Sequence, residues 1–154
     1  DLKGLTFVQR NNDNYEINVA FPYSGEYILR IFTKRKSDPG LYNWALDYKI
    51  RSTGSKGKLV GFPTTYEPFI KRNAYLYSPL SRNLRLYSRQ NFKIRVPEAR
   101  EVVVIVGERW VFLNKKGDIF TGEVIIDDTK VTVYAKFPGE RQYSGLLEYE
   151  VYLD

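Results

Sequence analysis

The stretch that decides the fold is residues 90–106, which read QNFKIRVPEAREVVVIV. In its first part, Phe92 and Ile94 alternate with charged residues, as in a strand that buries one face. Pro97 then ends that strand, because proline cannot donate to a β-ladder. Val102–Val106 is apolar at every position, which is typical of a strand covered on both faces. The two patterns predict a packed β-sheet.

Strand patterns recur along most of the chain. Segments of strand length between turns are Tyr15–Phe21, Glu26–Thr33, Trp44–Ile50, Arg109–Leu113, Ile119–Ile126, Lys130–Phe137 and Gly145–Leu153. The sequence shows no amphipathic helix longer than two turns, and Glu67–Asn73 is predicted as one short helical turn. Short strands at this spacing with tight turns predict an all-β antiparallel sandwich or barrel.

The alternation in Trp44–Ile50 predicts a half-buried strand. Trp44, Leu46, Tyr48 and Ile50 share one parity, and the charged residues share the other. By this parity the Trp44 ring is expected in a core.

Composition excludes most catalytic and metal chemistry. The 154 residues contain no Cys and no His, so thiol nucleophiles, disulfides, thiolate zinc sites and imidazole bases are absent. The absence of Met leads us to expect a segment of a longer protein. No apolar run is long enough to span a bilayer. No catalytic residue, metal ligand or cofactor is predicted.

Charge is unevenly spread along the chain. Residues 55–100 hold 10 basic and 2 acidic residues, whereas 101–154 hold 6 basic and 10 acidic residues. The simplest interpretation is two solvated outer faces of one sandwich. An anionic polymer such as a polysaccharide remains an alternative partner, and no nucleic-acid site is predicted because no groove-reading element is evident.

Two segments about 101 residues apart are similar. Tyr42–Ile50 and Tyr143–Val151 share the pattern Y-x-x-x-L-[DE]-Y-x-[IV], and each follows a strand, a Lys and a loop. This repeat predicts tandem homologous sandwiches. The chain divides best at the flexible stretch Ser52–Lys58.

On this basis, residues 1–54 are predicted as the C-terminal part of a first immunoglobulin-like module, and residues 55–154 as a complete immunoglobulin-like β-sandwich. The four strands of 1–54 leave a hydrophobic face to cover. Either the segment begins inside the first domain, or that half packs on the second.

The second half resembles a known family in a series of short strand segments. They are Phe62–Tyr66, Tyr75–Leu80, Phe92–Pro97, Val102–Val104, Trp110–Leu113, Phe120–Val124 and Leu146–Val151. This series resembles the immunoglobulin-like modules that follow the transglutaminase-like core in kyphoscoliosis-peptidase and hillarin-type proteins. Phe21–Phe32 and Tyr48–Ile50 resemble the end of the preceding module. The family's catalytic residues belong to that core, so the resemblance implies a non-catalytic appendage.

Aromatic side chains are the best binding candidates. Tyr75 and Tyr77 share one face beside a basic region, Tyr66 lies in a Pro-flanked loop, and Trp110 lies in a strand that is apolar on both faces. Exposed coplanar rings could stack on sugars, whereas rings at a sandwich rim or domain interface would be structural.

The expected function is therefore an interaction or spacer module attached to a transglutaminase-like or other extracellular enzyme. Its partner would be a protein or an adjacent domain of the parent chain, at a secreted or cell-surface location. A carbohydrate-binding module is the alternative, and a catalytic domain with carboxylates only is a weaker one.

Overall fold

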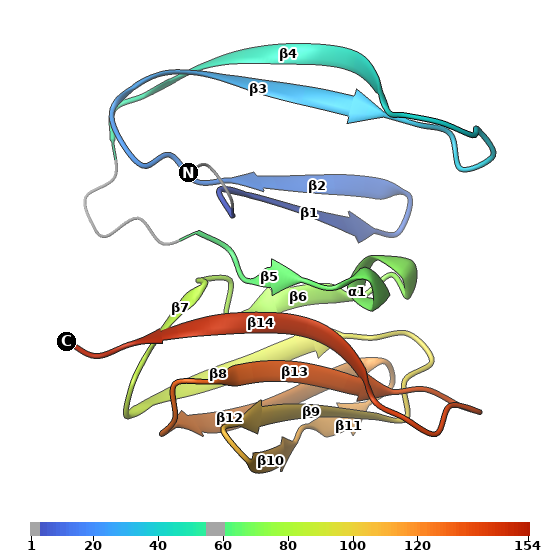
Figure 1. Ribbon diagram of the computed structural model, residues 1–154, viewed down its shortest axis with the longest axis vertical. Coiled ribbons are helices and arrows are strands. Elements are labelled where there is room, and N and C mark those ends of the chain that lie inside the picture. Colours follow the sequence, from blue (N-terminus) through green and yellow to red (C-terminus); the bar gives the residue numbers. More distant parts are fainter. Residues whose placement is uncertain (1–3, 55–60) are drawn as a thin grey trace. The chain divides into compact units, whose positions relative to one another are not determined.

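The structure, a computed structural model, describes residues 4–54 and 61–154. It is almost entirely β, and its residues fall into two compact units (Figure 1). The first unit comprises Asp1–Ala20 and Val60–Asp154, and the second comprises Phe21–Leu59.

The first unit holds most of the described elements. They are β1 (Thr6–Asn11), β2 (Asn14–Val19), β5 (Thr64–Thr65), α1 (Glu67–Lys71), β6 (Tyr75–Ser78), β7 (Asn83–Arg85), β8 (Ser88–Arg95), β9 (Glu101–Val106), β10 (Arg109–Phe112), β11 (Asn114–Lys116), β12 (Ile119–Ile126), β13 (Val131–Lys136) and β14 (Ser144–Tyr152). The short helix α1 confirms the helical turn predicted in this region.

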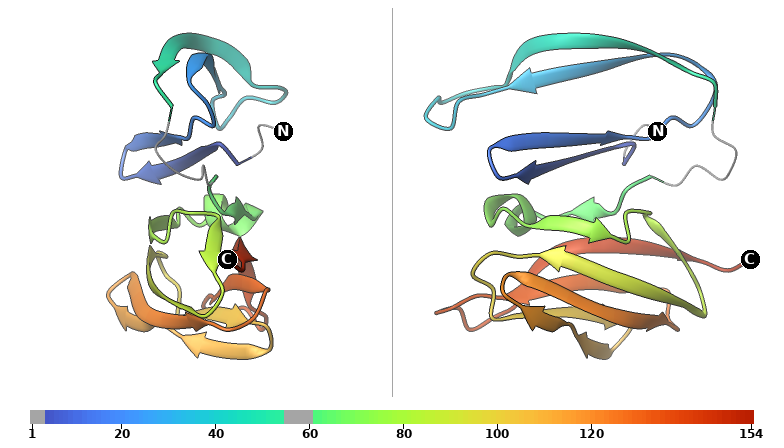
Figure 2. Two further views of the ribbon diagram at one scale, coloured as in Figure 1. Left: turned by 90° about the vertical axis from the view of Figure 1, so that its left-hand side faces the viewer. Right: turned by 180° about the vertical axis from the view of Figure 1, so that it is seen from behind.

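Two sheets of the first unit enclose its core. One sheet has the order β10-β9-β13-β14-β5, with β7 parallel to β14, and the other has the order β11-β12-β8-β6. Figure 2 shows the same strands from the side and from behind. The largest fully buried side chains include Phe69, Phe92, Phe120, Phe137, Leu76 and Leu147. This architecture confirms the predicted all-β, immunoglobulin-like antiparallel β-sandwich.

The two strands of the deciding stretch behave as their patterns predict. Phe92 and Ile94 of β8 point into the core, while the charged residues between them are more exposed. In β9, Val102 and Val104 belong to the core cluster, and Val103 on the other face is also fully buried. Both faces of β9 are therefore covered, as the unbroken apolar run indicates.

The β1–β2 hairpin packs on the rest of the first unit through one face. Phe7 stacks on Phe62 with ring centroids 5.6 Å apart. The Gln9 side chain exchanges two hydrogen bonds with the backbone of Leu76, at 2.5 and 3.0 Å. The other face of the hairpin carries Tyr15, which is 71% exposed.

The second unit is a long hairpin of β3 (Gly25–Thr33) and β4 (Asn43–Ser52). A register shift interrupts it: Ile31 pairs with Leu46, but Phe32 pairs with Trp44, so Ala45 is an extra residue, a β-bulge. The bulge moves Trp44 onto the face opposite to that of Leu46 and Tyr48.

The prediction that Trp44 lies in a core is wrong, because the ring is 63% exposed. Strict alternation fails at the bulge, so parity counted along the sequence assigns this ring to the wrong face. The face predicted as buried is itself uncovered within the second unit, where Leu46 and Tyr48 are 40% and 53% exposed, so the predicted half-buried strand is not observed there.

The internal repeat pairs in the same way at both of its sites. In the β13–β14 hairpin, Val133 pairs with Leu147, but Tyr134 pairs with Gly145, which leaves Leu146 as the extra residue. Leu146 lies 101 positions after Ala45, the offset of the repeat. The β3–β4 and β13–β14 hairpins therefore share a sequence pattern, a register and a bulge.

The flexible stretch predicted at Ser52–Lys58 lies partly outside the described residues, which end at Gly54 and resume at Gly61. The contacts group residues 1–20 with the sandwich and leave 21–59 apart. The predicted division into modules 1–54 and 55–154 stays a prediction.

Candidate binding surfaces

Tyr75 and Tyr77, two of the four predicted site residues, lie together on the edge strand β6. Their ring centroids are 4.8 Å apart, with an angle of 65° between the planes. Cations cover both rings: the Lys93 ammonium lies 4.6 Å from the Tyr77 centroid, and the Arg95 guanidinium lies 5.1 Å from that of Tyr75. These rings are edge to face rather than coplanar, and the cations occupy positions that a stacked sugar would need.

The Tyr75 hydroxyl donates a hydrogen bond of 2.5 Å to Glu16 of β2. This bond, with smaller contributions from burial and from the Glu16 charge, raises the pKa of Tyr75 to about 12. The same bond, followed by one from Asn11, lowers the pKa of Glu16. Tyr75 therefore ties the β1–β2 hairpin to the sandwich.

Trp110 lies on β10, the edge strand of the larger sheet, and forms a cluster with Phe112 and Tyr143. The Trp110 ring meets Tyr143 edge to face at 5.1 Å and lies tilted against Phe112 at 6.2 Å. Trp110 is 47% exposed. We call Trp110, Phe112 and Tyr143 the ring cluster.

The ring cluster lies on the outer face of the sandwich. The register pairs Phe112 with Val103 and Val103 with Tyr134, whereas the core residue Val104 pairs with Val111 and Val133. The Tyr143 hydroxyl donates to Glu101, which raises the pKa of Tyr143, and the Lys136 ammonium lies 5.4 Å from the Tyr143 ring. Charged groups of both signs therefore border these rings.

Tyr66 follows β5 at the opposite edge of the same sheet. Its hydroxyl donates to Glu148 of β14, and this hydrogen bond is the largest cause that raises the pKa of Tyr66 to about 12. Since β5 and β10 are the two ends of the strand order, Tyr66 and Trp110 are separated by three strands.

The structure thus brings together Tyr75 and Tyr77, but not these two with Trp110 or Tyr66. Tyr75 and Tyr77 belong to the β11-β12-β8-β6 sheet, and the other two belong to the β10-β9-β13-β14-β5 sheet. The four side chains do not form one flat platform. Their assignment to a binding site stays a prediction.

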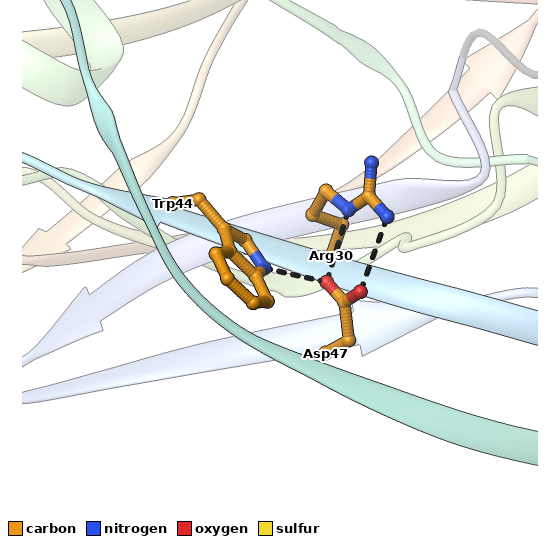
Figure 3. Close-up of polar contacts among 3 residues, drawn as sticks. All are labelled: Arg30, Trp44 and Asp47. Atoms are coloured by element: carbon orange, nitrogen blue, oxygen red, sulfur yellow. Dashed lines mark hydrogen bonds and ion pairs between the residues drawn. The ribbon is translucent and has the colours of Figure 1, made fainter.

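Sequence reasoning missed a second exposed aromatic site, on the β3–β4 hairpin. The Trp44 indole N–H donates a hydrogen bond of 2.8 Å to Oδ1 of Asp47. Asp47 also accepts two bonds from Arg30, from Nε at 3.0 Å and from a terminal nitrogen at 3.1 Å. Figure 3 shows the carboxylate between the indole and the guanidinium. The Arg30 bonds, followed by the Trp44 bond, lower the pKa of Asp47.

More exposed apolar side chains lie near Trp44, toward the turn of this hairpin. They are Phe32, the cross-strand partner of Trp44, and Leu41 and Tyr42 in the connecting loop. The same loop carries Lys34, Arg35 and Lys36. We call residues 32–44 the hairpin tip. A bulge is not visible in sequence, so only the exposed loop composition could have indicated this site.

Two shallow depressions lie on the described surface, and neither offers a free pair of carboxylates. One is lined by Glu67 and Glu140 among others, but Glu67 pairs with Lys71, and Glu140 pairs with Arg72. The other, on the second unit, has a single acidic residue, Glu26. Among the described residues, no three acidic side chains converge as a metal ion would require. None of the described helices has the length and hydropathy to traverse a bilayer.

Comparison with known proteins agrees with this architecture. Residues 1–63 match the family model of the KY-like, immunoglobulin-like domain. The chain is also 28% identical over 103 residues to kyphoscoliosis peptidase of Homo sapiens, an alignment that covers 66% of this chain and 15% of that protein. Immunoglobulin-like domains are in general non-catalytic. The chain is therefore similar to proteins of the kyphoscoliosis-peptidase type, and its residues 1–63 match their immunoglobulin-like module.

Proposed function

We propose that this chain is a non-catalytic interaction or spacer module, attached to a transglutaminase-like or other extracellular enzyme. The likeness to kyphoscoliosis peptidase supports the attachment, and the lack of Cys and His supports the absence of catalysis in this segment. The shared bulge of the two hairpins supports a tandem arrangement, in which residues 1–54 are the end of one module and residues 55–154 form the next.

The ring cluster is the observation that carries the interaction role. Trp and Tyr are enriched among residues that dominate binding energies at protein interfaces. Here Trp110 and Phe112 project from a strand whose other face is anchored in a packed sheet, so little conformational entropy is lost on binding. Lys136 and Glu101 beside the rings provide a polar rim. The partner would be an adjacent domain of the parent chain or another protein.

The test is binding between this chain and the remaining domains of its parent protein, measured by calorimetry. Trp110→Ala with Phe112→Ala is expected to weaken binding at least tenfold, since hot-spot truncations cost about 2 kcal/mol or more. Ile125→Ala, a truncation of an exposed apolar residue of the other sheet, serves as the control. Equal affinities of the two variants, or no binding by the unmodified chain, would remove the basis of this role.

Carbohydrate binding is the second candidate, favoured by the exposure of Trp110 on an outer sheet face. The angles of 85° and 40° between neighbouring rings of the cluster provide no flat platform for a sugar ring, which counts against it. Affinity electrophoresis against a panel of neutral and acidic polysaccharides decides between the two. Unchanged mobility on every polymer excludes the carbohydrate role.

A further inference from the structure

The hairpin tip combines exposed apolar rings with positive charge. Phe32, Tyr42 and Trp44 are all more than half exposed, and Leu41 is 89% exposed. Lys34, Arg35 and Lys36 lie between them, against one acidic residue, Asp38. A cluster of large exposed apolar side chains indicates a surface that contacts another protein or a membrane.

The hydrogen bonds of Trp44 favour burial of its ring in a binding interface. Its N–H, the one polar group of the indole, is already bonded to Asp47, so burial of the ring leaves no unsatisfied donor. The charge of Asp47 is in turn compensated by Arg30. The two bonds also hold the indole in one orientation, which lowers the entropy lost on binding.

The repeat indicates that this face looks outward in an immunoglobulin-like module. Trp44 and Asp47 correspond to Gly145 and Glu148 of the β13–β14 hairpin, and Glu148 lies on the exposed face of its sheet. The opposite face of β3–β4 carries Leu46 and Tyr48, which correspond to the core residues Leu147 and Tyr149. The Trp44 face is therefore the solvent side of the repeat.

We propose that the hairpin tip binds the surface of an anionic lipid bilayer, with Trp44 and its neighbouring apolar side chains entering the interface and Lys34, Arg35 and Lys36 contacting the headgroups. This inference goes beyond the interaction role of the ring cluster and rests on different residues. A bilayer supplies both an apolar layer and a negative surface, the two features that the hairpin tip complements.

The dimensions of the hairpin fit such an interface. Phe32 and Trp44 are cross-strand partners one pair from the loop end of the hairpin, so both rings lie near the end of the strands, on the scale of the ~5–10 Å to which interfacial side chains enter a bilayer. The Arg30–Asp47 pair lies a further step from the turn, with Arg30 opposite Asp47 in the register. The contact is peripheral: the rings enter, and the ion pair stays at the polar boundary.

The experiment follows Trp44 fluorescence in the complete chain carrying Trp110→Phe, which leaves Trp44 as the sole tryptophan. The probes are vesicles of phosphatidylcholine alone, and vesicles of phosphatidylcholine with about a third phosphatidylserine. The expected result is a blue shift and co-sedimentation with the anionic vesicles only. Each basic residue near the surface is expected to strengthen binding about fivefold. Lys34→Gln with Arg35→Gln and Lys36→Gln should therefore weaken binding about a hundredfold.

A charge-matched control separates the site from the net charge. Lys71→Gln with Lys116→Gln and Lys130→Gln removes three exposed charges from the first unit and should bind as the unmodified chain does. Trp44→Ala should weaken binding about tenfold, whereas Ile70→Ala, at an exposed residue of α1, should not.

Two outcomes would overturn the proposal: no blue shift on anionic vesicles, or equal losses in the two charge variants. Neither of these bears on the ring cluster, whose variants leave residues 32–44 intact.

Discussion

Among the described residues, single hydrogen bonds fix the orientation of several aromatic side chains. Tyr66, Tyr75 and Tyr143 each donate to a carboxylate, of Glu148, Glu16 and Glu101 respectively. Trp44 does the same with Asp47. In each case a large ring is held at the surface by its polar end, which is an economical way to expose an aromatic side chain in a defined orientation.

The bond between Tyr75 and Glu16 leads to a prediction about alkaline pH. The pKa of Tyr75 is raised from 10.0 to about 12, so the folded state holds this proton more tightly than the unfolded state does. The resulting stability is complete below pH 10 and is lost as pH rises through about 12. Tyr66 shares this raised pKa, so spectrophotometric titration of tyrosinate should show more than one late ionisation, and Tyr75→Phe should remove one of them.

Glu16→Gln is the matched variant for this titration, because it keeps Tyr75 but removes the acceptor charge. It should move the Tyr75 ionisation back toward pH 10. An unchanged titration curve in Glu16→Gln would show that the carboxylate does not hold the phenol proton.

At the scale of elements, the sequence pattern predicts where strands lie better than it predicts which face of a strand is buried. The alternation in β8 and the unbroken apolar run in β9 identify both strands and their burial, because each lies inside a sheet with regular pairing. The same reasoning fails for Trp44, because the bulge at Ala45 changes parity without any signal in hydropathy.

The sequence pattern also does not predict which face of the β1–β2 hairpin is buried. Its buried face includes Gln9, whose amide replaces a strand partner for the backbone of Leu76, while Tyr15 on the opposite face is exposed. Counting the hydrophobic residues on each face selects the wrong face here. Burying the Gln9 amide costs little free energy, because both of its hydrogen bonds are satisfied.

For the candidate site as well, the sequence indicates individual residues but not their arrangement in space. The Tyr75–Tyr77 pair was a candidate because both rings share one face, whereas parity could not place Trp110, since both faces of its strand are apolar. The structure places these residues at exposed or half-buried positions of edge strands. Their distribution over two sheets depends on pairing between distant strands, which spacing along the chain does not contain.

The repeat allows an element-scale prediction, since it places two tyrosines at equivalent positions in different surroundings. Tyr149 is 2% exposed and meets Phe92 edge to face at 5.6 Å, whereas Tyr48 is 53% exposed. Tyr149→Ala should lower the free energy of unfolding by about 3–5 kcal/mol. Tyr48→Ala should change it by less than about 1 kcal/mol. Urea unfolding followed by circular dichroism measures both, and equal losses would contradict the assigned surroundings.

At the scale of the whole molecule, the two units differ in what holds them together. The first unit has a continuous core between two sheets, and its central strands β8, β9, β12, β13 and β14 pair on both edges. The second unit is a two-stranded sheet within the described residues, and most of its large side chains are exposed. A hairpin without a covering layer is only marginally stable in water, because few apolar contacts offset the entropy of ordering its strands.

This difference predicts two levels of protection against hydrogen exchange in the same chain. Backbone amides of β8, β9, β12 and β13 should exchange slowly and together, since they open only when the sandwich unfolds. Amides of β3 and β4 should exchange orders of magnitude faster, through local opening of the hairpin. Mass spectrometry after a timed exchange in deuterated buffer measures both sets in one sample.

Equal protection of the hairpin and the sandwich would show that the hairpin shares the cooperative core. Slower exchange of β3 and β4 on addition of anionic vesicles, with no change in β9 and β13, would link this local stability to the lipid contact proposed for the hairpin tip.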